Sequence, residues 1–143
     1  MSADIETESA SEAAGPLPPA KPRLLIVDDE EYVRDALGRF LELRGFSVDV
    51  ARGGLEAVDK CARNTYHLVT MDLEMPNLSG REAISRIRSL CPELPILVLS
   101  GYAHLLDDHP LPGVAGVLKK PISLWKVEEE IRKFIPGRAS TVT

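Results

Sequence analysis

Residues 24–31 read LLIVDDEE, so four aliphatic side chains are followed directly by four acidic ones. A run of Leu, Ile and Val is typical of a strand that is buried on both faces of a sheet. Carboxylates instead need water, hydrogen-bond donors or a cation, because an unpaired buried charge is very costly. The stretch therefore predicts a buried strand whose end carries a polar site.

Four further segments repeat the aliphatic part of this pattern. After the strand at 23–28, strands are predicted at 46–51, 67–72, 95–100 and 116–120. Between most of them apolar residues recur at helical spacing: Val33, Leu37, Phe40 and Leu41; Leu55, Val58 and Cys61; Ala83, Ile84, Ile87 and Leu90. Such an alternation predicts an α/β fold, a doubly wound five-stranded parallel sheet with helices on both faces.

Two residues mark helix ends in this pattern. Gly45 is expected to end the first helix, because glycine is favoured just past a helix C-terminus. Ser123 is expected to cap the last helix, since serine is a favoured N-cap residue. That helix carries its apolar residues on one face, at positions Leu124, Val127, Ile131, Phe134 and Ile135.

The composition restricts the class of protein. The chain has 143 residues, of which 44% are hydrophobic and 27% charged, and its net charge is −5. No apolar run reaches the roughly 20 residues that span a bilayer, and the N-terminus lacks the apolar stretch of a signal peptide. We therefore expect a cytoplasmic protein without membrane contact, and the charge gives no indication of direct binding to nucleic acid.

The two ends of the chain differ from its middle. Residues 1–22 and 137–143 contain few large apolar side chains, which predicts disordered tails or linkers around one folded domain at 23–136. Cys61 and Cys91 lack the spacing of a metal or redox motif, so we expect free thiols in a reducing compartment.

The strand ends bring together a set of polar side chains. Asp28 and Asp29 follow the first strand, Asp72 ends the third, Ser100 the fourth and Lys120 the fifth. In an open parallel sheet the ligand site lies beyond the carboxyl ends of the strands, so these side chains are expected to converge.

Three converging carboxylates would repel one another. Each like-charge pair at 4 Å costs about 4 kcal/mol at an effective dielectric of 20, which a divalent cation would offset. Hard oxygen ligands that leave other positions open suit Mg²⁺, which also bridges to phosphate oxygens. With a hydroxyl and an ammonium group nearby, the set predicts an aspartate that becomes an aspartyl phosphate.

At this point the sequence resembles the receiver domain of two-component response regulators, over about residues 24–135. The motifs that carry the resemblance are the DD after the first strand, MDLEMPNLSG around Asp72, LSGY at Ser100 and KKP at Lys120. The resemblance implies the flavodoxin-like strand order 2-1-3-4-5. It also implies a phosphoprotein without separate substrate turnover, phosphorylated by a sensor histidine kinase or a histidine phosphotransfer protein.

Roles for single residues follow from the same resemblance. Asp72 matches the phosphoacceptor, and Lys120 matches the lysine that pairs with it. Ser100 matches the hydroxyl that moves onto the phosphoryl group. The remaining matches concern Mg²⁺ and one peptide bond: Asp29 as a direct ligand, Asp28 as an acid acting mostly through bound water, the backbone carbonyl of Glu74 as a further ligand, and a cis bond before Pro121.

Each of these residues also has a purely structural interpretation. Asp28 and Asp29 could cap the first helix, and Asp72 could be an ordinary turn residue. Ser100 with Gly101 could form a small-residue turn, and Lys119 is expected to face away from Lys120, towards solvent. Two other functions stay open: a receiver-like binding module that is never phosphorylated, and a phosphatase of the haloacid dehalogenase type, which would place its nucleophile on the first strand.

Three features depart from the usual receiver pattern. Val117 stands where the family often has an aromatic residue, and Ser79 where it often has an acid. Pro110 and Pro112 predict that the helix after the fourth strand is short or irregular and ends near His109. We expect a stand-alone response regulator that signals to an unknown downstream protein, with the receiver segment of a hybrid kinase as the alternative.

Overall fold

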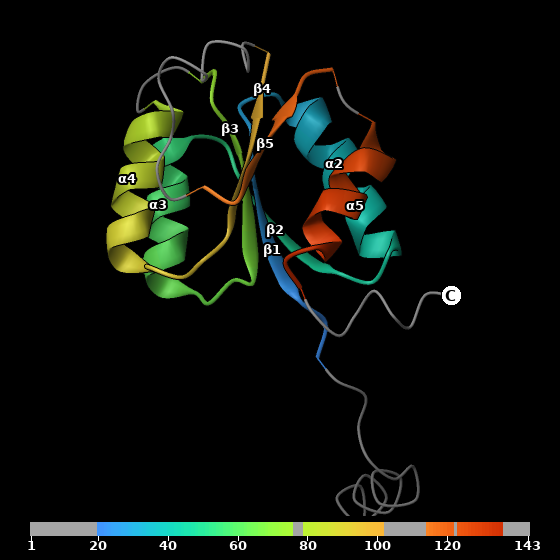
Figure 1. Cartoon of the computed structure of the whole chain (residues 1–143), viewed down its shortest axis with the longest axis horizontal. Coiled ribbons are helices and arrows are strands. Elements are labelled where there is room, and N and C mark those ends of the chain that lie inside the picture. Colours follow the sequence, from blue (N-terminus) through green and yellow to red (C-terminus); the bar gives the residue numbers. More distant parts are fainter. Residues whose placement is uncertain (1–19, 76–78, 102–113, 122, 136–143) are drawn as a thin grey trace, which may run out of the picture.

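The computed structural model describes residues 20–75, 79–101, 114–121 and 123–135, and Figure 1 shows a central sheet with helices on both sides. The strands are β1 (Arg23–Val27), β2 (Ser47–Ala51), β3 (Leu68–Asp72), β4 (Ile96–Ser100) and β5 (Gly116–Lys119). The helices are α2 (Glu31–Leu43), α3 (Gly54–Arg63), α4 (Gly80–Leu90) and α5 (Leu124–Arg132). The predicted strands agree with these bounds to within one residue at each end.

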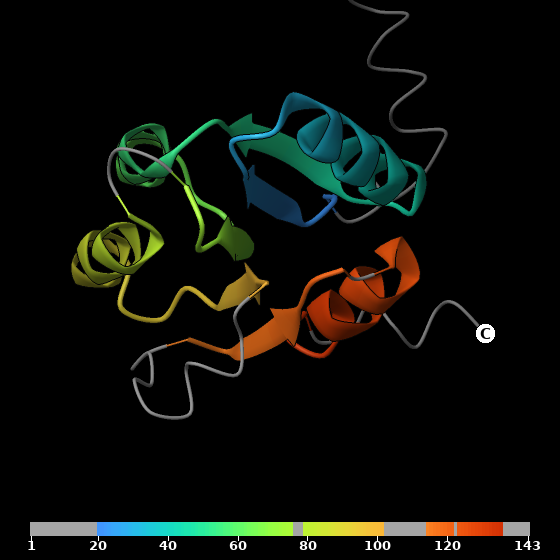
Figure 2. The ribbon, with the colours of Figure 1, turned by 90° about the horizontal axis from the view of Figure 1, so that it is seen from above.

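All four strand pairs are parallel, and the order in the sheet is β2-β1-β3-β4-β5. The predicted fold class and strand order are therefore confirmed. Since successive side chains of a strand point to opposite faces, β1 divides its residues between two cores. Leu25 and Val27 pack towards α3 and α4, whereas Leu24 and Ile26 pack towards α2 and α5. Figure 2 shows the sheet between these two pairs of helices.

The helix ends follow the predicted signals. Gly45 has a φ of 103°, a backbone conformation that is costly for a residue with a side chain, and it follows the C-cap residue Arg44. The Ser123 hydroxyl accepts a hydrogen bond of 3.1 Å from the amide of Lys126, as an N-cap does. Ser79, one of the departures from the family pattern, caps α4 in the same way, through the amide of Glu82 at 3.2 Å.

Gly80 lets α4 approach the end of β3. A Cβ built on this glycine would lie 2.9 Å from Cα of Leu73 and 3.0 Å from the carbonyl oxygen of Asp72. Any larger residue would therefore push α4 away from the segment that carries Asp72.

A buried ion triad joins α2 to α5. Glu128 is 4% exposed, and its carboxylate accepts hydrogen bonds from Arg44 at 3.0 Å and from Arg132 at 2.8 Å. Arg132 also donates to the backbone carbonyl of Arg44 at 2.9 Å. The triad fixes the two helices that cover one face of the sheet.

Other predictions can be compared directly with this fold. The side chain of Val117 is exposed on β5. Cys61 and Cys91 are both free thiols. The irregular helix predicted near His109 lies outside the described residues, as do residues 1–19 of the predicted tail at 1–22 and the tail at 137–143. Of the helices that are described, none is both long and apolar enough to cross a membrane.

Candidate functional site

The acidic residues that follow β1 and end β3 lie together. Carboxylate oxygens of Asp28, Asp29 and Asp72 all fall within 4.8 Å of one another. Asp28 and Asp72 are buried, at 1% and 2% exposure, whereas Asp29 is exposed. They meet because β1 and β3 are parallel neighbours, so the carboxyl ends of both strands, with the acidic residues there, lie at the same edge of the sheet.

Asp28 is held at the entrance of α2. Its Oδ1 accepts a hydrogen bond of 2.9 Å from the amide of Glu30. Its Oδ2 is buried, and within the described part of the chain it has no hydrogen-bond partner. The N-cap position of α2 is Glu30, so neither aspartate is the cap residue of this helix, although Asp28 binds the amide at its start. Burial raises the pKa of the Asp28 carboxyl, and the charges of Asp29 and Glu30 add to this effect.

Asp72 faces Lys120 across the end of the sheet. Its Oδ1 accepts hydrogen bonds from Nζ of Lys120 at 2.8 Å and from the amide of Glu74 at 3.1 Å. The hydrogen bond from the amide of Glu74 is the contact that an ordinary turn aspartate makes. The bond from Lys120 is an additional contact, to a residue far away in the sequence. Burial raises the pKa of Asp72 to about 6, with a contribution from the Asp28 charge, although Lys120 acts in the opposite direction.

Lys120 is brought to Asp72 by the end of β5. Burial alone would lower the pKa of its ammonium group, but the hydrogen bond to Asp72 raises it, and the net effect is a pKa above the ordinary value. Lys119 is exposed, so the predicted opposite directions of the two lysines are confirmed. The peptide bond between Lys120 and Pro121 is cis, as the resemblance implied.

Ser100 at the end of β4 contacts the segment after β3. Its hydroxyl donates a hydrogen bond of 2.5 Å to Oε2 of Glu74, and the amide of Gly101 donates one of 3.0 Å to Oε1 of the same carboxylate. Ser100 is 1% exposed. The predicted site residues thus come together at one edge of the sheet, and the Glu74 side chain joins them.

Comparison with known proteins agrees with this arrangement. The family model of the response regulator receiver domain matches residues 24–132. The chain belongs to the response regulator receiver family. The match is to this family, not to the phosphatase class that was the enzyme alternative.

Several curated relatives are response regulators named MprA. The chain is 45% identical over 120 residues to the one from Mycobacterium sp. strain KMS and 36% identical to the one from Mycobacterium leprae. In both cases the match covers 79% of this chain and 50% of the relative. The receiver chain therefore spans about half the length of these relatives.

Solved structures of receiver proteins are also similar. The response regulator TrrA from Thermotoga maritima, in complex with Mg²⁺ and BeF, has a TM-score of 0.73 at 32% identity, covering 79% of this chain and 98% of that one. The receiver domain of a sensor histidine kinase from Pseudomonas aeruginosa has a TM-score of 0.71 at 26% identity, covering 81% and 98%. That structure holds a magnesium ion in its active-site cleft.

The acidic cluster of this receiver fits a hard divalent cation. Three carboxylates converge, and the buried Oδ2 of Asp28 points to a ligand or a bound water that the described residues do not supply. Oxygen donors of this kind suit Mg²⁺ better than the nitrogen and sulfur ligands preferred by zinc. The predicted contribution of the Glu74 backbone carbonyl stays a prediction.

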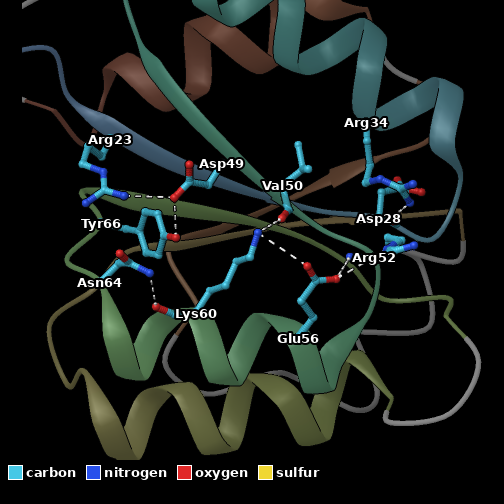
Figure 3. A network of polar contacts seen from close by, with 10 residues as sticks. All are labelled: Arg23, Asp28, Arg34, Asp49, Val50, Arg52, Glu56, Lys60, Asn64 and Tyr66. Carbon is cyan, nitrogen blue, oxygen red and sulfur yellow. Dashed lines mark hydrogen bonds and ion pairs between the residues drawn. The ribbon is translucent and has the colours of Figure 1, made fainter.

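Sequence reasoning missed two parts of the site. The Glu74 side chain was not predicted to contact Ser100, and no spacing signal indicates its direction. Arg34 of α2 donates a hydrogen bond of 2.8 Å to the backbone carbonyl of Asp28 (Figure 3). Arg34 is 8% exposed and lies on the buried stripe with Leu37 and Leu41. A charged residue on an apolar helix face was a signal that could have identified it.

Proposed function

We propose that this receiver domain accepts a phosphoryl group on Asp72. The observation that carries the proposal is the pair of contacts around this carboxylate: the ammonium of Lys120 on one oxygen, and the carboxylates of Asp28 and Asp29 within metal-binding distance. A phosphoryl group on Asp72 would be surrounded by a cation, hydroxyl and amide donors, and a site for a second cation. This is the electrostatic environment that phosphoryl transfer requires.

The transfer itself needs little from the protein beyond position and charge. An oxygen of Asp72 attacks phosphorus, a P–O bond forms, and the bond from phosphorus to the histidine nitrogen of the donor breaks. Lys120 neutralises charge on the phosphoryl oxygens, and the Ser100 hydroxyl can donate to one of them. Mg²⁺ held by Asp28, Asp29, Asp72 and the carbonyl of Glu74 would supply further positive charge at these oxygens.

A groove beside Lys120 supports the proposal of a phosphohistidine partner. It has a volume of about 490 Å³ and is lined by apolar side chains of α2 and α5, among them Val33 and Leu124, and also by Asp28 and Lys120. Tyr32 also lines it and is 73% exposed. An apolar groove next to the reacting carboxylate fits a helix of a histidine kinase or histidine phosphotransfer protein that carries the phosphohistidine.

Beryllofluoride, a mimic of the phosphoryl group, provides the direct test. With Mg²⁺ present, the wild-type protein should bind it and should also become phosphorylated by acetyl phosphate. Asp72→Asn should do neither, whereas Asp59→Asn, at an exposed aspartate of α3, should behave as wild type. Phosphorylation of Asp72→Asn under these conditions would contradict the assignment. If none of the three proteins, wild type included, binds beryllofluoride, the binding-module alternative is favoured.

The wider context stays a prediction. A stand-alone regulator and a receiver segment of a hybrid kinase would use the same chemistry at Asp72. The two differ in the mass of the native polypeptide, which an immunoblot of source cells with an antibody against this domain would measure. The absence of nucleic-acid binding and the cytoplasmic location also stay predictions.

A further inference from the structure

The carboxylate of Glu74 spans two hydrogen-bond donors at the end of β4. One oxygen accepts from the Ser100 hydroxyl at 2.5 Å and the other from the Gly101 amide at 3.0 Å. A hydroxyl and a neighbouring amide that bind one anion through two oxygens form a small anion-binding site. In this receiver the anion in that site is a side chain of the protein.

This site lies beside the reacting carboxylate. Asp72, the last residue of β3, pairs with Leu99 of β4, so the next residue of β4, Ser100, lies beside the end of the strand that carries the phosphoacceptor. The amide of Lys120 donates to the carbonyl of Ser100 at 2.9 Å, which places Ser100 between the strands that carry Asp72 and Lys120. Donors in this position would be available to the oxygens of a phosphoryl group on Asp72 only if no other anion held them.

We propose that Glu74 is a positioning residue. In the unphosphorylated domain its carboxylate holds the Ser100 hydroxyl and the Gly101 amide, and it competes with the phosphoryl group for these two donors. The inference rests on the proposed function, because it requires a phosphoryl group on Asp72. Phosphorylation then exchanges one anion for another, and the Glu74 side chain is released as the hydroxyl changes partner.

The competition has a definite direction. Glu74 is an exposed residue, so its carboxylate regains water when it leaves the two donors. The exchange nevertheless breaks two charge-assisted hydrogen bonds and places a released carboxylate near a dianionic group. Glu74 should therefore weaken the binding of phosphoryl mimics and slow phosphorylation, and its removal should have the opposite effect.

The experiment measures beryllofluoride affinity by fluorine NMR in the presence of Mg²⁺. Glu74→Gln and Glu74→Ala should each bind beryllofluoride about tenfold more tightly than wild type, because neither variant keeps the two charge-assisted hydrogen bonds of the Glu74 carboxylate. Glu30→Gln is the matched control. It removes a charge that also acts on the acidic cluster, but Glu30 lies after β1, on the other side of β3 from β4. A change of about twofold or less is expected for this control.

A double-mutant comparison tests whether the effect passes through Ser100. In the Ser100→Ala background, Glu74→Gln should improve beryllofluoride affinity much less than it does in wild type, because one of the two contested donors is already gone. An equal improvement in both backgrounds would show a general charge effect and overturn the inference. The inference would also be overturned if Glu30→Gln and Glu74→Gln improved beryllofluoride affinity equally.

A second measurement examines the unphosphorylated domain alone. The amide proton of Gly101 should shift in Glu74→Gln and Glu74→Ala without beryllofluoride, because its acceptor has changed or is absent. If wild type binds beryllofluoride and both Glu74 variants bind it with the same affinity, the inference is overturned and the proposed function is left intact. If wild type does not bind beryllofluoride, the proposed function fails and the inference fails with it.

Discussion

The guanidinium of Arg34 donates a hydrogen bond of 2.8 Å to the backbone carbonyl of Asp28, and both residues are buried (Figure 3). This contact joins the first turns of α2 to the loop that carries the acidic pair. Arg34 supplies no ligand atom to the cluster. Its position indicates that it holds the loop so that Asp28 and Asp29 face Asp72.

Replacing Arg34 should therefore weaken Mg²⁺ binding without removing a carboxylate. We expect Arg34→Met to raise the Kd for Mg²⁺ about tenfold, the lower end of what is lost when a group that orients metal ligands is removed. Arg34→Lys keeps a donor on a long side chain and should restore part of the affinity. Titration calorimetry measures both, and an unchanged Kd in Arg34→Met would show that the loop holds its shape without this contact.

Asp72 should lower the stability of the metal-free domain. Burial raises its pKa from an ordinary value of 3.8 to about 6, so the ionised form is disfavoured by folding even beside Lys120. In EDTA at pH 7.5, Asp72→Asn should increase the free energy of unfolding by on the order of 2 kcal/mol. Urea denaturation measures this, and a less stable variant would contradict it.

The same difference should depend on pH. Between about pH 4 and 6 the folded domain binds more protons at Asp72 than the unfolded chain does, so stability falls as the pH rises through this window. The advantage of Asp72→Asn should thus be complete above pH 7 and disappear below pH 4. A constant advantage from pH 4 to 8 would mean that the carboxylate is not the cause.

The ion triad between α2 and α5 should contribute to stability through Glu128. Removing the shared carboxylate in Glu128→Ala leaves Arg44 and Arg132 without their buried partner. These side chains are 35% and 16% exposed and can regain part of their hydration, so we expect a loss of about 2 kcal/mol, below the usual cost of breaking a fully buried pair. The measurement is the free energy of unfolding in urea.

The neighbouring residue provides the control for this prediction. Glu129 is 63% exposed and lies 3.8 Å from Lys126, so it forms only a surface ion pair. Glu129→Ala should cost less than about 0.5 kcal/mol. Equal losses for Glu128→Ala and Glu129→Ala would show that burial of the triad does not matter.

The two thiols should differ in reactivity. Cys61 is 4% exposed, and burial raises the pKa of its thiol to about 12. Because the thiolate is the reactive form, Cys61 should be alkylated by iodoacetamide at pH 8 at least tenfold more slowly than the half-buried Cys91. Peptide mass spectrometry of the folded protein separates the two sites, with the urea-unfolded protein as control. Equal rates in the folded protein would show that local opening exposes Cys61.

Local sequence was sufficient for the elements of this receiver. The aliphatic segments of β1, β3 and β4 are buried on both faces, and Thr70 in β3 is the one polar residue inside them, so their sequences indicate buried strands directly. Gly45 and Ser123 marked helix ends because these two residue types satisfy backbone groups within a few positions of themselves.

The sequence also determined which groups enter the site. Asp28, Asp72, Ser100 and Lys120 each follow or end a strand, and parallel strands present their carboxyl ends at one edge. Once the elements are known, their convergence requires no further information. The roles within the family came from the order of the motifs along the chain.

Only the tertiary structure decided how side chains far apart in sequence meet. Glu74 and Ser100 are 26 residues apart, and Arg44 and Glu128 are 84 apart. Their contacts depend on how loops and helices are oriented over the sheet, which is set by the packing of the two cores and not by local preference. The direction of the Glu74 carboxylate is such a case, because a flexible exposed side chain takes the partner that the folded neighbours offer.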